Sequence, residues 1–281
     1  MDIHKPKPIH NFSEFLKEVG TIVLGVSIAL GAEQAVEYFH WRGQVAQARE
    51  VVATEMATNV RNALYRMRTS VCVERRLDEL GAILDTASKT GSLPPLGDIA
   101  MPHRGFWPNG AWNSVVASQT AAHFPRQQFT DITSSYTQIE RQAGFSVEEM
   151  AAWYALYTMV GPGRRLDPSS EARIREGLSQ ARTINRVMVA IANIVAVRAN
   201  SLGLSFSAGD LALIDQGKHR PLQPDHDPEV SLYNGGGVPF GAICAPIGKP
   251  PSVSGQGHFS AVPSLIDDAV KNLPDYAGGA R

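Results

Sequence analysis

The stretch that decides how this chain folds is VGTIVLGVSIALGA, residues 19–32, in which no residue carries a charge. Phe12 and Phe15 precede it, and Tyr38 and Trp41 follow it. An α-helix rises about 39 Å between residues 15 and 41, close to the roughly 40–45 Å of a bilayer with its headgroups. Aromatic residues are enriched at both bilayer interfaces. The pattern therefore predicts a single transmembrane anchor over residues 12–41.

Two other interpretations of this run stay open, because a spanning helix needs roughly 20 mainly apolar residues. Ala29-Leu30-Gly31 resembles the small-residue cleavage site of a signal peptide. A helix buried in a soluble core, or one lying in the membrane interface, is the other alternative.

The charges around the run give an orientation. Lys5, Lys7 and Lys17 precede it, whereas Arg42 and Arg49 follow it among several glutamates. The positive-inside rule counts lysine and arginine only, so it narrowly favours a cytoplasmic tail over residues 1–11. This orientation places nearly all of the chain outside the cytoplasm.

Small residues within the anchor predict a surface for packing against another membrane helix. Three of them recur at a spacing of four, and such stripes allow helix backbones to approach closely in lipid. A glutamate expected beside the stripe would face protein, water or a cationic partner. The alternative is a lipid-facing helix whose glutamate reaches the headgroups. The candidate packing residues are Gly20, Gly25, Ser27, Gly31, Glu33 and Ala35.

The chain beyond the anchor predicts an all-α extramembrane domain over residues 42–203. A helical apolar stripe, resembling a short coiled-coil seam, continues to a helix end between Gly81 and Gly91. Asp167-Pro168 starts a second long helix, which should end near residues 202–203 and pack antiparallel to the first. The stripe consists of Val45, Ala48, Val52, Met56, Ala63 and Met67.

Three shorter helices are expected between the two long ones, after a Gly- and Pro-rich loop at residues 91–110. They should start near Asn109, after Pro125 and at Ser146, where Ser146 and Glu149 have the spacing of a capping box. Residues 204–281 are rich in proline and glycine, which predicts an extended segment closed by a short helix at 263–273.

Two cysteines, Cys72 and Cys244, lie far apart. Outside the cytoplasm they could form a disulfide that ties the C-terminal region to the first long helix. Two buried free thiols are the alternative. The net charge of −1 gives no footprint for a nucleic-acid partner.

No common catalytic constellation occurs: the sequence has no GxSxG, HExxH, P-loop or GxGxxG motif. We therefore expect no catalytic residue, no cofactor and no metal. A polar group at His219, Asp225, His226, Asp227 and Glu229 matches no closed metal site and is best interpreted as a solvated loop. A ligand pocket among Trp107, Trp112, His123 and Trp153 is the alternative hypothesis.

The stretch FLKEVGTIVLGVSIALGAEQAVEYFHWR, with CVERRLDEL further on, resembles a group of uncharacterised bacterial membrane-anchored proteins. Their pattern is a short tail, a glycine-rich hydrophobic helix ending in Gly-Ala-Glu-Gln and a helical extension. The resemblance covers about 30 residues and brings no activity. It implies a bacterial inner-membrane location, which, with the orientation above, puts the N-terminus in the cytoplasm and the bulk of the chain in the periplasm.

These features predict a non-enzymatic, single-pass membrane protein. It would act as an accessory or scaffolding subunit, docking through its anchor to an integral membrane partner or to further copies of itself. The alternative is a periplasmic ligand-binding or sensor module that uses the tryptophan- and histidine-lined pocket.

Overall fold

The structure, a computed structural model, describes residues 12–102, 105–219, 242–244 and 247. The fold is all-α, as the sequence predicts, with a single pair of two-residue strands in this part of the chain. The elements are α1 (Phe12–Thr90), β1 (Ser92–Leu93), α2 (Gly110–Ala117), η1 (Thr120–His123), α3 (Arg126–Tyr157), β2 (Arg164–Arg165), α4 (Pro168–Arg198), η2 (Ala199–Ser201), α5 (Ala208–His219) and η3 (Ala242–Cys244).

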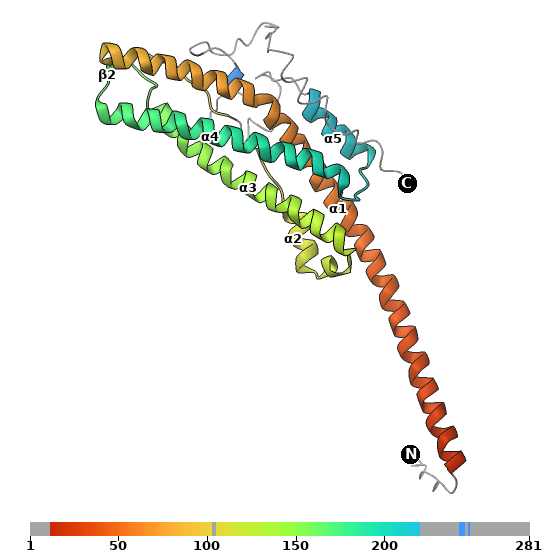
Figure 1. Ribbon diagram of the computed structural model, residues 1–281. Helices are drawn as coiled ribbons and strands as arrows, with labels where there is room; N and C mark the ends of the chain where they lie inside the picture. The colour runs from red at the N-terminus through yellow and green to blue at the C-terminus, as the bar shows by residue number, and fades with distance from the viewer. Residues whose placement is uncertain (1–11, 103–104, 220–241, 245–246, 248–281) are drawn as a thin grey trace, which may run out of the picture.

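Helix α1 is continuous over 79 residues, and its two halves have different surroundings. Its first half projects alone from the molecule, and its second half packs against α4 and α5 (Figure 1). The predicted apolar stripe faces the bundle, since all six of its members are buried. The helix ends at Thr90, inside the predicted window.

Helices α1 and α4 pack antiparallel, as predicted. Two ion pairs show the direction: Arg175 pairs with Asp85 at 3.0 Å, and Arg182, further along α4, pairs with Asp78, earlier on α1, at 2.6 Å. Helix α4 starts where expected because Asp167 accepts hydrogen bonds from the backbone N–H groups of Ser169 and Ser170. Hydrogen bonds from the hydroxyls of Ser169 and Ser170, reinforced by these backbone bonds, hold the pKa of Asp167 below its usual value.

The prediction of separate helices at Pro125 and Ser146 is wrong, because α3 runs unbroken from Arg126 to Tyr157. Ser146 is buried inside the helix, and its hydroxyl donates to the carbonyl of Gln142 rather than capping a new helix. Glu149 reaches into the bundle core instead of back to the Ser146 amide.

A short helical hairpin lies beside α1 at the end of the bundle nearest the projecting segment (Figure 1). It consists of α2 and η1, joined by Gln119, whose φ of 62° turns the chain sharply. The first of the three predicted helices is therefore shorter than expected, and Ala122 belongs to η1 instead.

The prediction of an extended chain from residue 204 is wrong for its first part, where α5 forms and packs against α1. Ser207 and Asp210 make a reciprocal cap: the Asp210 N–H donates to the Ser207 hydroxyl, and the Asp210 carboxylate accepts from the Ser207 N–H. The predicted terminal helix at 263–273 lies outside the described residues.

The structure contains the Cys72–Cys244 disulfide, which closes a sequence separation of 172 residues. Arginines beside Cys72 hold the same segment, since Arg75 donates to the carbonyl of Cys244 and buried Arg76 donates to the carbonyls of Ile99 and Ile243. Element η3 is therefore fixed to the C-terminal third of α1 by covalent and polar contacts.

Candidate functional site at the base of the bundle

The projecting half of α1 is apolar and fully exposed. In the described part of the chain it is the one helix long and apolar enough to cross a membrane, and none of its apolar window is buried against protein. Large apolar side chains there are between 38% and 76% exposed, which is far more apolar surface than a protein normally presents to water. They are Phe12, Phe15, Leu16, Val19, Ile22, Val23, Leu24, Val26, Ile28, Leu30, Val36, Tyr38 and Phe39.

The six candidate packing residues divide between two faces of α1. Ser27, Gly31 and Ala35 follow one another at steps of four, and Gly20 lies seven residues before Ser27, so these four share one face. Glu33 is two residues from Gly31, about 200° around the helix. The expectation that Glu33 lies beside the small-residue stripe is therefore wrong, and Gly25 also falls away from that face.

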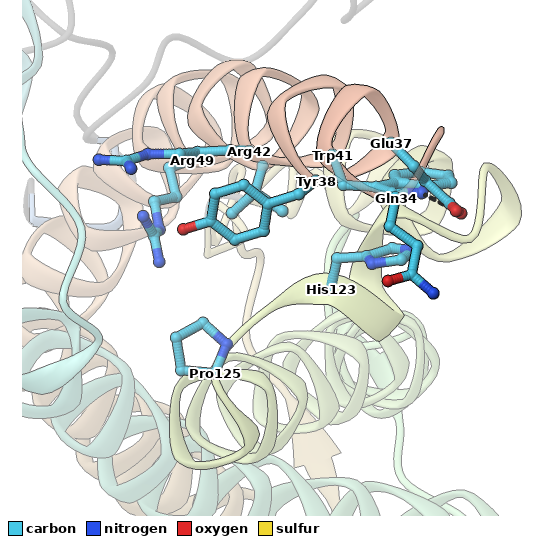
Figure 2. A pocket seen from close by; sticks show the side chains of 9 residues that line it. Gln34, Glu37, Tyr38, Trp41, Arg42, Arg49, His123 and Pro125 are labelled. Carbon is cyan, nitrogen blue, oxygen red and sulfur yellow. Dashed lines mark hydrogen bonds between the residues drawn. The ribbon is translucent and has the colours of Figure 1, made fainter. Parts of the chain in front are cut away.

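The stripe face continues into the aqueous part of α1. Steps of three and four from Ala35 lead to Tyr38, Arg42, Val45 and Arg49, and these four residues line a cavity. The cavity has a volume of about 460 Å³ and opens to the outside where α1 meets the end of η1 (Figure 2). Its other lining residues are Gln34, Glu37, Trp41, His123 and Pro125.

One wall of the cavity is an aromatic contact between α1 and η1. The rings of Trp41 and His123 stack with centroids 3.8 Å apart and an interplanar angle of 12°. The indole N–H of Trp41 donates to Glu37 at 3.2 Å, which fixes the orientation of the ring. The stacking thus joins α1 to η1, two elements far apart in the sequence, at the mouth of the cavity.

Arg49 is held at the opposite wall. Its Nε and Nη2 donate to the side-chain oxygen of Gln128 at 3.1 and 2.8 Å, and its guanidinium lies 5.6 Å from the Phe124 ring centroid. Gln128 is anchored in turn, because its amide nitrogen donates to the carbonyls of Leu202 and Gly203. The remaining Arg49 donors have no acidic partner in the described residues.

Charge is separated along the cavity. Figure 2 shows the guanidinium groups of Arg42 and Arg49 at one end, with the Tyr38 hydroxyl directed toward them. Glu37 and Gln34 lie at the other end. Arg42 is exposed and forms no ion pair within the described part of the chain. The cavity therefore presents cationic donors at one end and an acidic acceptor at the other.

The tryptophan-lined pocket predicted as an alternative does not form. Trp107 and Trp112 are buried in one core cluster and Trp153 in another, so they do not converge. Trp112 packs against Tyr136 with ring centroids 5.8 Å apart. Only His123 of the four residues lines the cavity, on the rim formed by η1.

A polar network lies inside the bundle. Arg66 pairs with Glu149 through two hydrogen bonds of 2.9 and 2.6 Å and also donates to Asn185 at 2.7 Å. The three residues are at most 4% exposed and come from α1, α3 and α4. They connect the three long helices and leave no access for a ligand, so we interpret the network as structural.

A second carboxylate from α1 organises the base hairpin. Glu55 accepts from the N–H groups of Ala111 and Trp112 at the start of α2 and from the Tyr136 hydroxyl at 2.7 Å. Burial, reinforced by the charge and hydrogen bond of Glu55, raises the pKa of Tyr136 well above its usual value. Glu55 therefore fixes α2, and through it η1, against α1.

The sequence pattern alone did not lead to the cavity residues on α1, although they stand together in the sequence. Gln34, Glu37, Tyr38, Trp41 and Arg42 form a polar and aromatic run directly after the apolar segment. Of this run, the sequence pattern assigns Tyr38 and Trp41 to a membrane interface and uses Arg42 only for the orientation. Its partner His123 is more than 80 positions away, and nothing in the local pattern assigns it to this wall.

The described residues contain no group of three or more His, Cys, Asp or Glu side chains placed to hold a metal. Of the predicted polar group, His219 contacts Asp215 on α5, and the other members lie outside the described residues. Comparisons with protein families, with characterised proteins and with solved structures found no significant match.

Proposed function

We propose that this protein is a non-enzymatic, single-pass membrane protein that acts as an accessory or scaffolding subunit of a membrane complex. The observation that carries the proposal is the complete exposure of the apolar half of α1, which has no protein partner within the described chain. Every backbone hydrogen bond of a helix is internal, so this segment suits a bilayer.

The disulfide supports a location of the helical bundle outside the cytoplasm. Disulfides persist in oxidising environments such as the bacterial periplasm and are rare in the cytosol. Cys72 and Cys244 both belong to the part of the chain beyond the anchor. We therefore assign the bundle to the periplasmic side of a bacterial inner membrane and residues 1–11 to the cytoplasmic side.

The partner would dock on the face of α1 formed by Gly20, Ser27, Gly31 and Ala35. Nothing lies within 4 Å of a Cβ atom built at Gly20 or Gly31, so this face is open. Small residues permit close backbone contact between membrane helices. Because the face continues into the base of the bundle, a helix seated on it would also meet the extramembrane domain. A second copy of this chain would use the same face.

A ligand-binding or sensor module is the second candidate. The cavity at the base of the bundle favours it, although it is not the predicted tryptophan pocket.

The test compares Gly31→Leu with Ile22→Leu, since Ile22 is exposed on the same segment but on the opposite side of the helix from the small-residue face. Each full-length chain is extracted in mild detergent, captured through a C-terminal tag, and analysed by native gel and mass spectrometry. We expect wild type and Ile22→Leu to migrate as a complex with other membrane proteins or with copies of themselves.

Gly31→Leu should reduce that complex by tenfold or more while the circular dichroism spectrum of the bundle stays unchanged. A complex of unchanged size and yield in Gly31→Leu would contradict docking through this face. A clean monomer in the wild type would contradict the subunit role and favour the binding module.

A further inference from the structure

The base hairpin, which consists of α2 and η1, reaches the end of the apolar segment of α1. The ring of His123, the last residue of η1, stacks on Trp41. His123 also lines the cavity together with Gln34 and Glu37, which precede Trp41 on α1 (Figure 2). Tryptophan is enriched at membrane interfaces. Given the membrane location proposed above, the end of η1 therefore lies at the level of the lipid headgroups.

The sequence around the base hairpin contains no acidic residue. Residues 99–130 include neither aspartate nor glutamate, whereas the whole chain has 27 acidic residues among 281, about one in every ten. The hairpin surface thus carries no negative charge that lipid phosphates would repel, and its exposed side chains are mostly small or uncharged. They are Asn113, Ser114, Val116, Ala117, Ser118, Gln119, Ala122 and His123.

Two carboxylates of α1 belong to this region, and each already accepts hydrogen bonds. Glu55 accepts from the N–H groups of Ala111 and Trp112, so it is directed into the contact between α1 and α2 rather than toward the exposed face of the hairpin. Glu37 accepts from the indole N–H of Trp41. The remaining charges around the hairpin are positive.

Two exposed arginines flank the base hairpin. Arg42 follows Trp41 on α1, and Arg126 begins α3 directly after Pro125, a residue of the cavity wall. Neither arginine forms an ion pair within the described part of the chain. Arg42 is farther from the apolar segment than Trp41, on the side where lipid phosphates lie. Cations at this depth are attracted to anionic headgroups, and the attraction fades within a Debye length.

We infer that the base hairpin rests on the membrane surface as a second contact beside the anchor, where Arg42 and Arg126 pair with the phosphates of anionic phospholipids. The end of α2 at Ala117 enters the headgroup layer. Two contacts restrict the tilt of the bundle relative to the membrane, because Glu55 fixes the hairpin to α1. This inference rests on the membrane location proposed above, but not on the docking of a partner.

The test measures the depth of single labelled cysteines in the full-length chain. Both native cysteines are joined in a disulfide, so Ala117→Cys provides one free thiol at the exposed end of α2. Ala172→Cys is the matched control, because Ala172 is exposed near the start of α4, at the opposite end of the bundle (Figure 1). Each variant is labelled with a fluorophore and reconstituted into vesicles that contain a headgroup-nitroxide lipid. The vesicles consist of phosphatidylcholine, alone or with an equal part of phosphatidylglycerol.

We expect the nitroxide to quench the Ala117→Cys label at least threefold more than the Ala172→Cys label in vesicles with phosphatidylglycerol. Quenching at position 117 should fall by half or more in phosphatidylcholine alone. Adding Arg42→Gln and Arg126→Gln to Ala117→Cys should produce the same loss in vesicles with phosphatidylglycerol. Adding Arg173→Gln should not, because Arg173 is exposed on α4 and outside the hairpin.

Equal quenching at positions 117 and 172 would overturn the inference, as would quenching at 117 that is independent of phosphatidylglycerol or of the two arginines. Ile22→Cys, within the exposed apolar segment, separates this result from a failure of the membrane location. Quenching of its label by an acyl-chain nitroxide, with none at 117 by the headgroup nitroxide, would refute the hairpin contact alone. No quenching at position 22 would refute the membrane location and the hairpin contact with it.

Discussion

At the scale of single residues, Arg66 and Glu149 form a buried ion pair between α1 and α3. Both side chains are nearly inaccessible to water, and two hydrogen bonds join them across α1 and α3. Transfer of both charges into the core is costly, so the pair contributes little net stability, but the loss of one partner leaves a buried charge uncompensated. The pair therefore fixes the relative position of the helices.

Glu149→Gln should reduce the free energy of unfolding by about 3 kcal/mol, near the lower end of the cost of breaking a buried pair. The carboxamide keeps the size of the side chain but cannot neutralise Arg66. Urea unfolding followed by circular dichroism in mild detergent measures the difference.

Glu148→Gln is the control for this prediction, because Glu148 is the exposed neighbour on the same helix. It should change the free energy of unfolding by no more than about 0.5 kcal/mol. Equal effects of the two substitutions would refute the structural role of the pair.

Two serine-acid pairs show why local patterns succeed at one place and fail at another. Ser146 with Glu149, and Ser207 with Asp210, have the same spacing. The second pair caps α5 with reciprocal hydrogen bonds, whereas the first lies inside α3. Burial of Glu149 against Arg66 decides the difference, and that partner is 83 residues away.

At the scale of elements, α5 packs closely against the backbone of α1. A Cβ atom at Gly217 would lie 2.6 Å from the carbonyl oxygen of Arg61, nearer than real Cβ atoms approach. The glycine thus permits α5 to press against the backbone of α1, and Ile214 enters the core beside it. Two glycines in α5 weaken its local helical signal, so this helix depends on packing.

Gly217→Ala should therefore destabilise the docking of α5 by about 1–3 kcal/mol, the usual cost of overpacking. Limited proteolysis between α4 and α5 measures the release of this helix, and cleavage should become faster. Gly209→Ala is the control within the same helix, because its Cβ would meet no atom closer than 3.7 Å. Faster cleavage in both variants, or in neither, would contradict the prediction.

The elements that the sequence predicted best are those with long, regular patterns. The start of α4 follows from Asp167-Pro168, and the buried face of α1 follows from its apolar spacing. The merged helix α3 and the short helix α5 could not be predicted in this way, because a contact with a distant element determines each of them.

At the scale of the whole molecule, one face of α1 connects three features. It carries the small residues of the apolar segment, then the cavity, and then the apolar stripe buried in the bundle. The first and third features follow from the sequence pattern alone. The cavity between them needs the hairpin of α2 and η1 to return to α1, which depends on Glu55, Gln119 and the stacking of His123 on Trp41.

We propose that the N-terminal half of α1 crosses a membrane. Labelling of single introduced cysteines on either side of the apolar segment tests this directly. Both native cysteines are joined in a disulfide, so Ser13→Cys and Gln44→Cys each provide one free thiol. Spheroplasts carrying each variant are treated with a membrane-impermeant maleimide before or after lysis. We predict that Gln44→Cys reacts in intact spheroplasts and that Ser13→Cys reacts only after lysis. Equal labelling of both positions before lysis, or of neither, would contradict the account.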